Sequence, residues 1–322
     1  MFDAIRSRIL AKPLSRVHIG FLIAVLLSLF FIPGLTSMSY GDRLRAYGQD
    51  FFHFPLFAAI AAALLAWWPR RGSHVTKAGI VTALAVGLAA VVELTQPYVG
   101  RTAAWDDLLL GAAGCVSVIA VYVGLRSASM VLKKCLGTVA TVLFIVAMAP
   151  LVLIVADRAR AARAFPLVDS FERRTEPGRW KSEGCSVSQV RAHATHGSQS
   201  LKLVVDGSGA KYPSIFLTDG PMDWQGYRRF AMDVFLEGEV SRSLWVRADD
   251  KPNPKYADRA QTVVELKPGR NTIWIDLGAF SLKPDSTLLD LSNIHTVVIF
   301  LDGPRAKDTI YIDRLILSKP GA

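Results

Sequence analysis

The segment Leu136-Gly-Thr-Val-Ala-Thr-Val-Leu-Phe-Ile-Val-Ala-Met-Ala-Pro-Leu-Val-Leu-Ile-Val-Ala156 runs for 21 residues without a charged side chain. An α-helix needs about 20 consecutive apolar residues to cross the hydrocarbon core of a bilayer. This segment has that length and is much longer than a buried strand of a soluble protein. It therefore predicts a transmembrane helix.

Four more apolar segments come before this one. The expected spans cover residues 17–33, 53–68, 78–96, 108–125 and 136–156. The second is short, but it carries no charge and ends in the interfacial pair Trp67 and Trp68. The first follows four basic residues, as a secretory signal would. Because four spans come after it, we expect an uncleaved membrane anchor.

The composition changes at about residue 165. The chain has 322 residues, of which 51% are hydrophobic, and its mean hydropathy is +0.31, yet the long apolar runs end at Ala156. A soluble protein rarely has a positive mean hydropathy. We therefore expect an α + β protein of two domains. Residues 1–164 would form a polytopic transmembrane helix bundle of five spans, and residues 165–322 a water-soluble domain.

The formal net charge of +10 belongs almost entirely to the first half. Residues 1–164 contain 16 Lys and Arg against 7 Asp and Glu, whereas residues 165–322 contain 21 against 20. The excess lies in the loops between spans, so it does not indicate a nucleic-acid partner. The cysteines at 115, 135 and 185 show neither a disulfide framework nor the spacing of metal ligands, and small buried hydrophobic residues are the simpler interpretation.

The distribution of basic residues also predicts an orientation. If the N-terminus is cytoplasmic, the cytoplasmic loops carry 10 basic residues and the opposite loops carry 6. This bias favours a bacterial inner-membrane protein with a cytoplasmic N-terminus and an extracytoplasmic C-terminal domain. Arg158, Arg160 and Arg163, which follow the last span on the outer side, argue mildly against it.

Polar residues of the membrane half gather at the outer ends of spans two to four. His53 opens the second span, Glu93 and Gln96 close the third on one helical face, and Asp107 opens the fourth. Ionisable groups near membrane depth are costly and mark functional sites by default.

This pattern resembles that of the VanZ-like membrane proteins over about residues 49–114. The matching positions are His53, Glu93-Leu-Thr-Gln96, Arg101, Asp107 and Gly114. The chain departs from the pattern at Gln49 and Asp50, where the family usually has Asp and Lys, and at Gly111, where it favours Asn. The resemblance implies a link to glycopeptide-antibiotic tolerance and no established enzymatic activity.

Two interpretations of this polar cluster remain open. In a functional pocket, Arg101 and His53 would meet a lipid head group or phosphate, while Glu93 and Asp107 hold or deprotonate the ligand. In a structural role, Asp107 caps its helix, Arg101 pairs with Glu93, and Gln96 bonds across helices. The sequence shows no metal-ligand set and no pair of nucleophile and base, so we prefer a non-enzymatic protein and keep catalysis as an alternative.

The second half alternates between apolar and polar residues with turn signals between the runs. Strands are expected at 200–205, 230–236, 244–248, 262–266, 271–277, 296–301 and 309–317. Seven or eight short strands without an amphipathic helix predict an antiparallel β-sandwich of the jelly-roll type.

This half resembles the galactose-binding and carbohydrate-binding-module jelly rolls. The matching stretches are Val168-Asp-Ser-Phe-Glu172 followed by Trp180, His196–Leu201, Asp223–Tyr227, Pro268–Asn271 and Tyr311-Ile-Asp313. Such domains often carry a structural calcium ion. The resemblance implies Glu172 and Asp313 as its oxygen donors, and solvated acids at strand ends are the alternative. We expect no other cofactor.

Strand alternation selects candidate ligand-binding residues. Trp245 and Arg247 share a non-core face, as do Trp274 and Asp276 on a later strand, and Asp233 is also placed opposite the core. Flat aromatic rings that stack on sugar CH groups, beside charged groups that bond hydroxyls, suit a carbohydrate site. The alternative is that both Trp side chains pack beneath loops such as 252–256.

Together these features predict an envelope protein that recognises or docks on a glycan, or a lipid-linked glycan, at the outer face of the cytoplasmic membrane. Such a protein could serve glycopeptide-antibiotic tolerance or exopolysaccharide handling. Its partners would be a membrane lipid or lipid-linked precursor and a carbohydrate. Two alternatives stay open: a membrane enzyme acting on a lipid-linked or phosphorylated envelope precursor, and a scaffold of a polysaccharide export system.

Overall fold

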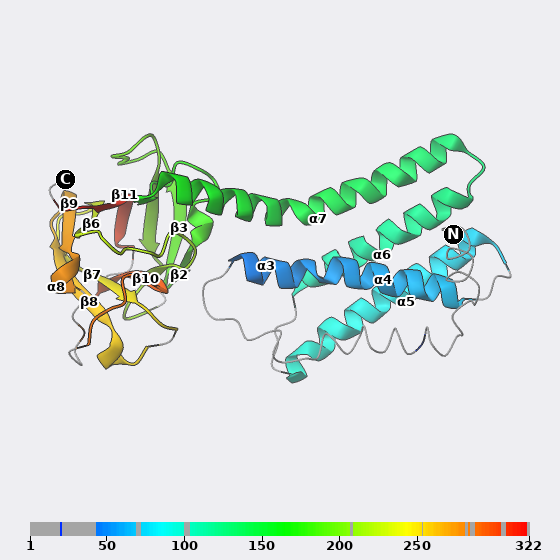
Figure 1. Ribbon diagram of the computed structural model, residues 1–322, viewed down its shortest axis with the longest axis horizontal. Helices are drawn as coiled ribbons and strands as arrows, with labels where there is room; N and C mark the ends of the chain where they lie inside the picture. The colour runs from blue at the N-terminus through cyan, green and yellow to red at the C-terminus, as the bar shows by residue number, and fades with distance from the viewer. Residues whose placement is uncertain are drawn as a thin grey trace, which may run out of the picture. The chain divides into compact units, whose positions relative to one another are not determined.

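The structure is a computed structural model, and it divides into two compact units (Figure 1). It describes residue 20 and residues 43–320, apart from short segments at 69–71, 100–103, 207–208, 253, 281–282, 284–286 and 304–306. One unit contains residues 45–152, and the other contains residues 153–320 together with Arg43 and Leu44. Each unit is described by itself.

Long apolar helices form the first unit. They are α3 (Arg43–Phe51), α4 (His53–Trp67), α5 (His74–Thr95), η3 (Gln96–Val99), α6 (Trp105–Arg126) and α7 (Met130–Ala164), the last of which continues into the second unit. Four stretches are long and apolar enough to cross a membrane: Arg43–Trp67, His74–Tyr98, Trp105–Arg126 and Met130–Ala164. They coincide with the second to fifth expected spans. The expected span at 17–33 lies outside the described residues, except for Gly20.

Helices α4, α5 and α6 pack against one another through small side chains. Ile60, Val81 and Ala85 are completely buried in their shared core. Gly114 lets α6 approach α4 closely, since a Cβ atom there would lie 2.1 Å from the carbonyl oxygen of Phe54. Large apolar side chains also lie on the outer surface of the helices, as Leu94 does.

Helix α7 extends two turns beyond the expected end of the last span. Its final residues, Asp157–Ala164, alternate Arg with Ala and so favour a helix despite their charge. Asp157 is fully buried in the second unit and accepts hydrogen bonds from Arg179 at 2.8 and 2.9 Å and from Arg43 at 2.6 Å. The end of the helix is thereby part of the β unit.

The second unit consists of two antiparallel sheets. Its strands are β1 (Leu167–Asp169), β2 (Trp180–Glu183), β3 (Cys185–Val190), β4 (Ser200–Val205), β5 (Ser214–Leu217), β6 (Arg229–Leu236), β7 (Arg242–Asp249), β8 (Ala260–Leu266), β9 (Gly269–Asp276), β10 (Thr296–Asp302) and β11 (Thr309–Ser318). Three short helices lie between them: η4 (Pro177–Arg179), η5 (Tyr256–Asp258) and α8 (Leu277–Phe280).

One sheet has the strand order β3-β4-β11-β6-β9, with β1 also paired to β11, and the other has the order β2-β5-β10-β7-β8. From β4 to β7 successive strands alternate between the sheets, which is a jelly-roll connection. The inward faces of both sheets form one apolar core, in which Leu203, Met232, Val246 and Ile299 are buried.

The antiparallel β-sandwich and all seven expected strands are confirmed. Strands β1, β2, β3 and β5 were not among the predicted strands. Three of them have only three or four residues, and β3 carries polar side chains at alternate positions without a strong apolar run, so the period-two signal is weak in each.

Candidate functional sites

The polar residues of the first unit converge from three helices. His53 begins α4, Glu93 lies in the last turn of α5, and Asp107 lies in the first turn of α6. The Nε2 atom of His53 is 3.6 Å from Oε1 of Glu93, and its Nδ1 atom is 3.6 Å from Oδ1 of Asp107. All three side chains are buried. The sequence therefore identified a set of residues that the fold brings together.

Backbone and amide groups hold this cluster in place. Gln96 is completely buried and donates from Nε2 to Glu93 at 3.1 Å. The other carboxylate oxygen of Glu93 accepts the backbone N–H of Ala104 at 3.1 Å. The Nδ1 atom of His53 lies 3.0 Å from the carbonyl oxygen of Asp50, so a proton on Nδ1 would leave Nε2 as the basic nitrogen facing Glu93. Arg101 lies outside the described residues.

An apolar pocket of about 270 Å³ opens beside Glu93. Its lining is otherwise apolar and comes from Ala90, Leu94, Ala104, Trp105 and Leu108. A carboxylate next to an imidazole can move a proton, and the apolar pocket could accept an acyl or isoprenoid chain. One ligand atom from each of His53, Glu93 and Asp107 can be chosen so that all three lie within 4.8 Å of one another, but different nitrogens of His53 face the two carboxylates. That geometry fits a proton relay better than a single metal ion.

The two residues suggested for calcium anchor a loop instead. Asp313 accepts the backbone N–H groups of Thr195 at 2.6 Å and His196 at 2.8 Å. Glu172 accepts those of Ser198 at 2.8 Å and Gln199 at 2.7 Å. Calcium needs six to eight oxygen ligands, and here the groups that face the carboxylates are mainly N–H donors. The arrangement does not fit a coordination shell, and we derive no calcium-dependent property from it.

Three further candidates lie on the six-stranded sheet. Asp233 is buried and paired with Arg314 at 2.8 Å. Asp276 accepts the backbone N–H of Gly278 at 3.0 Å at the start of α8 and lies 3.5 Å from Arg228. Trp274, on the edge strand β9, is 55% exposed. These residues are therefore separated from Trp245 and Arg247, which lie on the five-stranded sheet.

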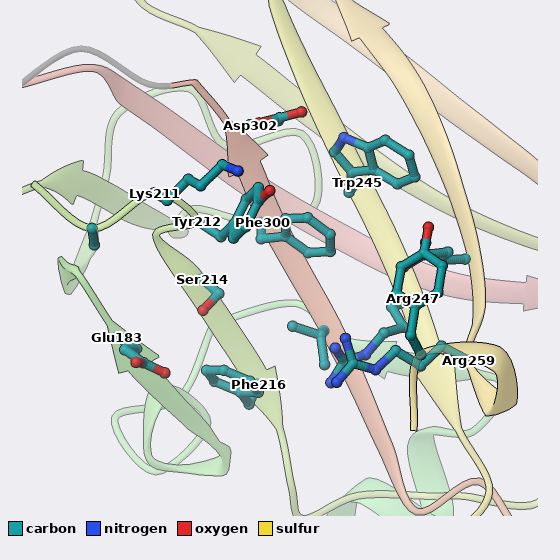
Figure 2. A pocket seen from close by; sticks show the side chains of 14 residues that line it. Glu183, Lys211, Tyr212, Ser214, Phe216, Trp245, Arg247, Arg259, Phe300 and Asp302 are labelled. Atoms are coloured by element: carbon teal, nitrogen blue, oxygen red, sulfur yellow. The ribbon is translucent and has the colours of Figure 1, made fainter. Parts of the chain in front are cut away.

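Trp245 and Arg247 line a pocket of about 570 Å³ on the outer face of the five-stranded sheet (Figure 2). Strand register arranges the pocket floor in two rows. The first row is Glu183 on β2, Ser214 on β5, Phe300 on β10 and Trp245 on β7. The second row is Lys181, Phe216, Val298, Arg247 and Gln261, in the order β2, β5, β10, β7 and β8. Lys181 is the only member of the two rows that does not line the described pocket.

The first row provides an aromatic surface. The rings of Trp245 and Phe300 stack with centroids 5.9 Å apart and an angle of 9° between their planes. Tyr212, from the loop before β5, meets Phe300 edge to face at 5.8 Å. Small Ser214 and Val298 lie between the larger side chains and leave the sheet hollowed there. Such a surface offers ring faces to a flat, partly apolar ligand.

The second row adds positive charge to the pocket. Arg247 is joined there by Arg259, which precedes β8, and Figure 2 shows both guanidinium groups extending to the same part of the floor. Lys211 and the carboxylates of Glu183 and Asp302 lie toward the other side of the pocket. The pocket thus combines aromatic rings with groups that can bond hydroxyls and anions.

Alternation along one strand found Trp245 and Arg247, but it could not find their neighbours. Phe300 lies on β10, which pairs with β7, whereas Phe216 on β5 and Glu183 on β2 are placed beside it only by the order of strands in the sheet. Tyr212 and Arg259 come from loops, which carry no periodic signal.

No protein-family model matches the chain, and no curated protein matches it. The resemblance of residues 49–114 to the VanZ-like proteins therefore stays a prediction.

Several solved structures match part of the chain at low identity. An exo-β-agarase has a TM-score of 0.41 at 16% identity, over 48% of this chain and 25% of its own. A family 11 carbohydrate-binding module from Clostridium thermocellum, in complex with a mixed-linked tetrasaccharide, has a TM-score of 0.37 at 16% identity, over 48% of this chain and 94% of its own. The family 22 module of Clostridium thermocellum Xyn10B has a TM-score of 0.35 at 18% identity, over 49% of this chain and 97% of its own. The chain thus spans a quarter of the length of the agarase. At these scores none of the matches carries an argument about function.

Proposed function

We propose that the β unit binds carbohydrate in the pocket on its five-stranded sheet. The observation that carries the proposal is the stacked pair Trp245 and Phe300 on the floor of a hollow of about 570 Å³. Sugar rings have apolar CH faces that stack on aromatic rings, and hydroxyl edges that bond charged side chains. The pocket offers both kinds of group within one hollow.

The strand register favours a ligand-binding role for Trp245 over a role in packing the core. Trp245 sits on the outer face of β7 and lies directly opposite Phe300 of β10, so the two rings form one continuous surface. The core is built from the other face, where Leu244 and Val246 are buried. The Trp245 ring is therefore not required to fill the core.

The test compares two Trp residues on different sheets. Full-length protein in lipid nanodiscs would be applied to a glycan array, beside Trp245→Ala and Trp274→Ala. Trp274 is the matched control because it is more exposed and lies on β9 of the other sheet. We expect Trp245→Ala to lose roughly 1–3 kcal/mol of binding, the range that nucleic-acid bases lose when an aromatic side chain beneath them is replaced by alanine, and Trp274→Ala to bind as the wild type does. Loss of binding only in Trp274→Ala would place the site on the other sheet and refute the proposal.

We further propose that this carbohydrate belongs to a bacterial cell envelope. The support is that the β unit follows four helices that are long and apolar enough to cross a membrane. With the orientation favoured by the basic loops, the pocket would face the extracytoplasmic side, where envelope glycans are assembled.

A second candidate function rests on the polar cluster in the first unit. His53 lies between two carboxylates, and one of them borders an apolar pocket of about 270 Å³. In this proposal Glu93 and His53 exchange a proton with the polar end of a lipid-linked or phosphorylated envelope precursor, whose hydrocarbon chain occupies the pocket.

Lipid extracts would test this second candidate. Cells that express wild-type protein, Glu93→Gln or Ser117→Ala would be compared by mass spectrometry of their lipid-linked precursors. Ser117 is the control because it is buried on α6, and its hydroxyl donates within its own helix, to the carbonyl of Ala113 at 2.8 Å. If the protein is such an enzyme, the profile of lipid-linked precursors changes in cells with the wild-type protein or Ser117→Ala. That change is lost in cells with Glu93→Gln at equal protein abundance. Identical profiles in all three would contradict it.

A further inference from the structure

We propose that the glycan bound on the five-stranded sheet is acidic, and that its carboxylate or sulfate lies against Arg247 and Arg259. The inference rests on the proposed carbohydrate site and names the class of ligand that fits it. It follows from the positions of these two side chains and from the charges around them.

The two arginines reach the same part of the pocket from different elements. Arg247 belongs to β7 and is paired in register with Val298 on one side and Gln261 on the other. Arg259 enters from the end of η5, where its Nε atom donates to the carbonyl oxygen of Pro254 at 3.3 Å. Figure 2 shows the two guanidinium groups side by side on the floor, with Glu183 on the opposite side of the pocket.

The carboxylates beside Arg247 and Arg259 do not balance both positive charges. Arg247 pairs with Asp249 at 3.0 Å, and that carboxylate is buried. Among the described residues, no carboxylate lies within 4.0 Å of Arg259. Two guanidinium groups therefore share one carboxylate, which leaves one positive charge at a partly desolvated point.

Arg247 and Arg259 repel each other, and a bound anion would reduce this repulsion. Burial lowers the pKa of the Arg247 guanidinium, Asp249 opposes that effect, and the like charge of Arg259 adds to it. A ligand carboxylate or sulfate would be held by charge-assisted hydrogen bonds from both groups, for which the planar guanidinium is well suited. A neutral sugar would leave the repulsion in place.

The spacing of the two rows matches this mode of binding. Trp245 and Arg247 are two residues apart on one strand, so their rows are separated by about 7 Å. A sugar ring stacked on Trp245 and Phe300 would then extend a substituent, or the next sugar unit, over the arginines. Recognition of the ring and of the charge would use different residues.

The experiment uses an array of matched pairs and the full-length protein in nanodiscs. Each acidic oligosaccharide is printed beside its neutral counterpart, with uronates beside their carboxyl-reduced forms and sulfated sugars beside their desulfated forms. Wild-type protein is compared with Arg259→Gln and with Arg270→Gln. Arg259 is chosen because Arg247→Gln would leave the buried Asp249 without its partner. Arg270 is the charge-matched control, since it is exposed on β9 of the other sheet.

We expect wild type and Arg270→Gln to bind an acidic member at least about tenfold more tightly than its neutral counterpart, as one charge-assisted hydrogen bond predicts. Arg259→Gln should remove most of that difference, and added salt should weaken only the acidic member. The uronate and sulfate pairs show which anion is recognised.

Two results would overturn the inference, and they are distinguishable. Equal or stronger binding of the neutral members, still dependent on Trp245, would refute an acidic ligand while the carbohydrate site stands. Binding of neither set would refute the carbohydrate site itself, and this inference with it.

Discussion

Asp169 shows how one buried charge can make the β unit sensitive to pH. Its carboxylate accepts hydrogen bonds from the indole N–H of Trp180 at 2.8 Å and from the backbone N–H of Ser170 at 2.9 Å. Arg179 is 3.7 Å away but is engaged by Asp157 at 2.8 Å. Burial is therefore only partly compensated, and it raises the pKa of Asp169 to about 7.

A raised pKa means that the folded protein holds a proton on Asp169 that the unfolded chain has released. The unfolded value is about 3.9, so the free energy of unfolding should fall as the pH rises from about 4 to about 7. We expect this one group to contribute a decrease of roughly 2–4 kcal/mol across that window. In Asp169→Asn the contribution should vanish, whatever the absolute stability of the variant.

Urea unfolding followed by tryptophan fluorescence at several pH values between 4 and 7.5 measures the effect. The quantity to compare is the difference between wild type and Asp169→Asn, because histidines titrate in the same window. Burial opposes ionisation of Asp233, but Arg314 lowers the pKa of this carboxyl below its usual value. Asp233 therefore changes its charge below pH 4, outside the pH range of the experiment. If the free energy of unfolding changes equally with pH in wild type and Asp169→Asn, Asp169 is ionised over the whole range.

At this scale the sequence predicted side-chain direction well and side-chain partners poorly. Alternation placed Trp245 and Arg247 on the outer face of β7, where they lie. It also placed Asp233 opposite the core, but it could not show that Arg314 would cover that carboxylate. Arg314 lies within an irregularity of β11 between Asp313 and Ile316 and has a positive φ of 49°, so its direction depends on a local backbone feature that has no periodic signal.

At the scale of elements, the contact between α4 and α6 depends on Gly114. A Cβ atom at this position would come within 2.1 Å of a backbone oxygen of α4, and backbone cannot rotate away as a side chain can. We expect Gly114→Ala to separate the helices and destabilise the bundle by roughly 1–3 kcal/mol, as overpacking usually does.

Thermal unfolding in detergent, followed by circular dichroism at 222 nm, tests this expectation. Gly87→Ala is the matched control, because a Cβ atom at Gly87 on α5 would have no neighbour within 4 Å. That control should be neutral or slightly stabilising, since Ala favours a helix more than Gly does. Equal melting temperatures for Gly114→Ala and wild type would mean that α4 and α6 are not in close contact.

The loop between β3 and β4 gives a prediction about metal dependence. Glu172 and Asp313 accept the backbone N–H groups of four of the five positions 195–199, all but Gly197, and so they can order the loop without a cation. We expect hydrogen exchange of Ser198 and Gln199 to accelerate in Glu172→Ala. It should be unchanged when wild-type protein is treated with calcium or EDTA. Slower exchange in calcium that is reversed by EDTA would instead assign these carboxylates to a metal site.

Long, strongly patterned elements were predictable, and short ones were not. The apolar helices and strands such as β6 and β10 carry their periodicity over many residues. Strand β5 has only four residues, and its place between β2 and β10 is fixed by pairing with distant segments. The pocket needs β5 for Ser214 and Phe216, so its floor could not be assembled from the sequence alone.

At the scale of the whole molecule, the ion pairs of the second unit account for part of an anomaly in the distribution of basic residues, the one that Arg158 contributes. Arg158 follows the last apolar segment and opposes the favoured orientation. It is paired with Asp219 at 2.8 Å, and Arg43 bonds the same carboxylate at 2.7 Å and Asp157 at 2.6 Å. These arginines are partly neutralised in the fold, so their weight in the positive-inside rule is reduced.

With Arg43 and Arg158 discounted, the loops on the outer side hold four basic residues, and the loops at 68–77 and 126–134 hold six. We therefore predict that these loops are cytoplasmic, and that Tyr98 and the β unit are extracytoplasmic.

An impermeant maleimide applied to intact spheroplasts should label Tyr98→Cys and Ser188→Cys, both at exposed positions, but not Ser73→Cys or Ser129→Cys. Cys135 is exposed and must first be replaced by Ser, whereas Cys115 and Cys185 are buried. Labelling of all four variants after lysis shows that each site is reactive. The reverse pattern in intact spheroplasts would place the pocket in the cytoplasm, and the glycan would then have to be sought among cytoplasmic precursors.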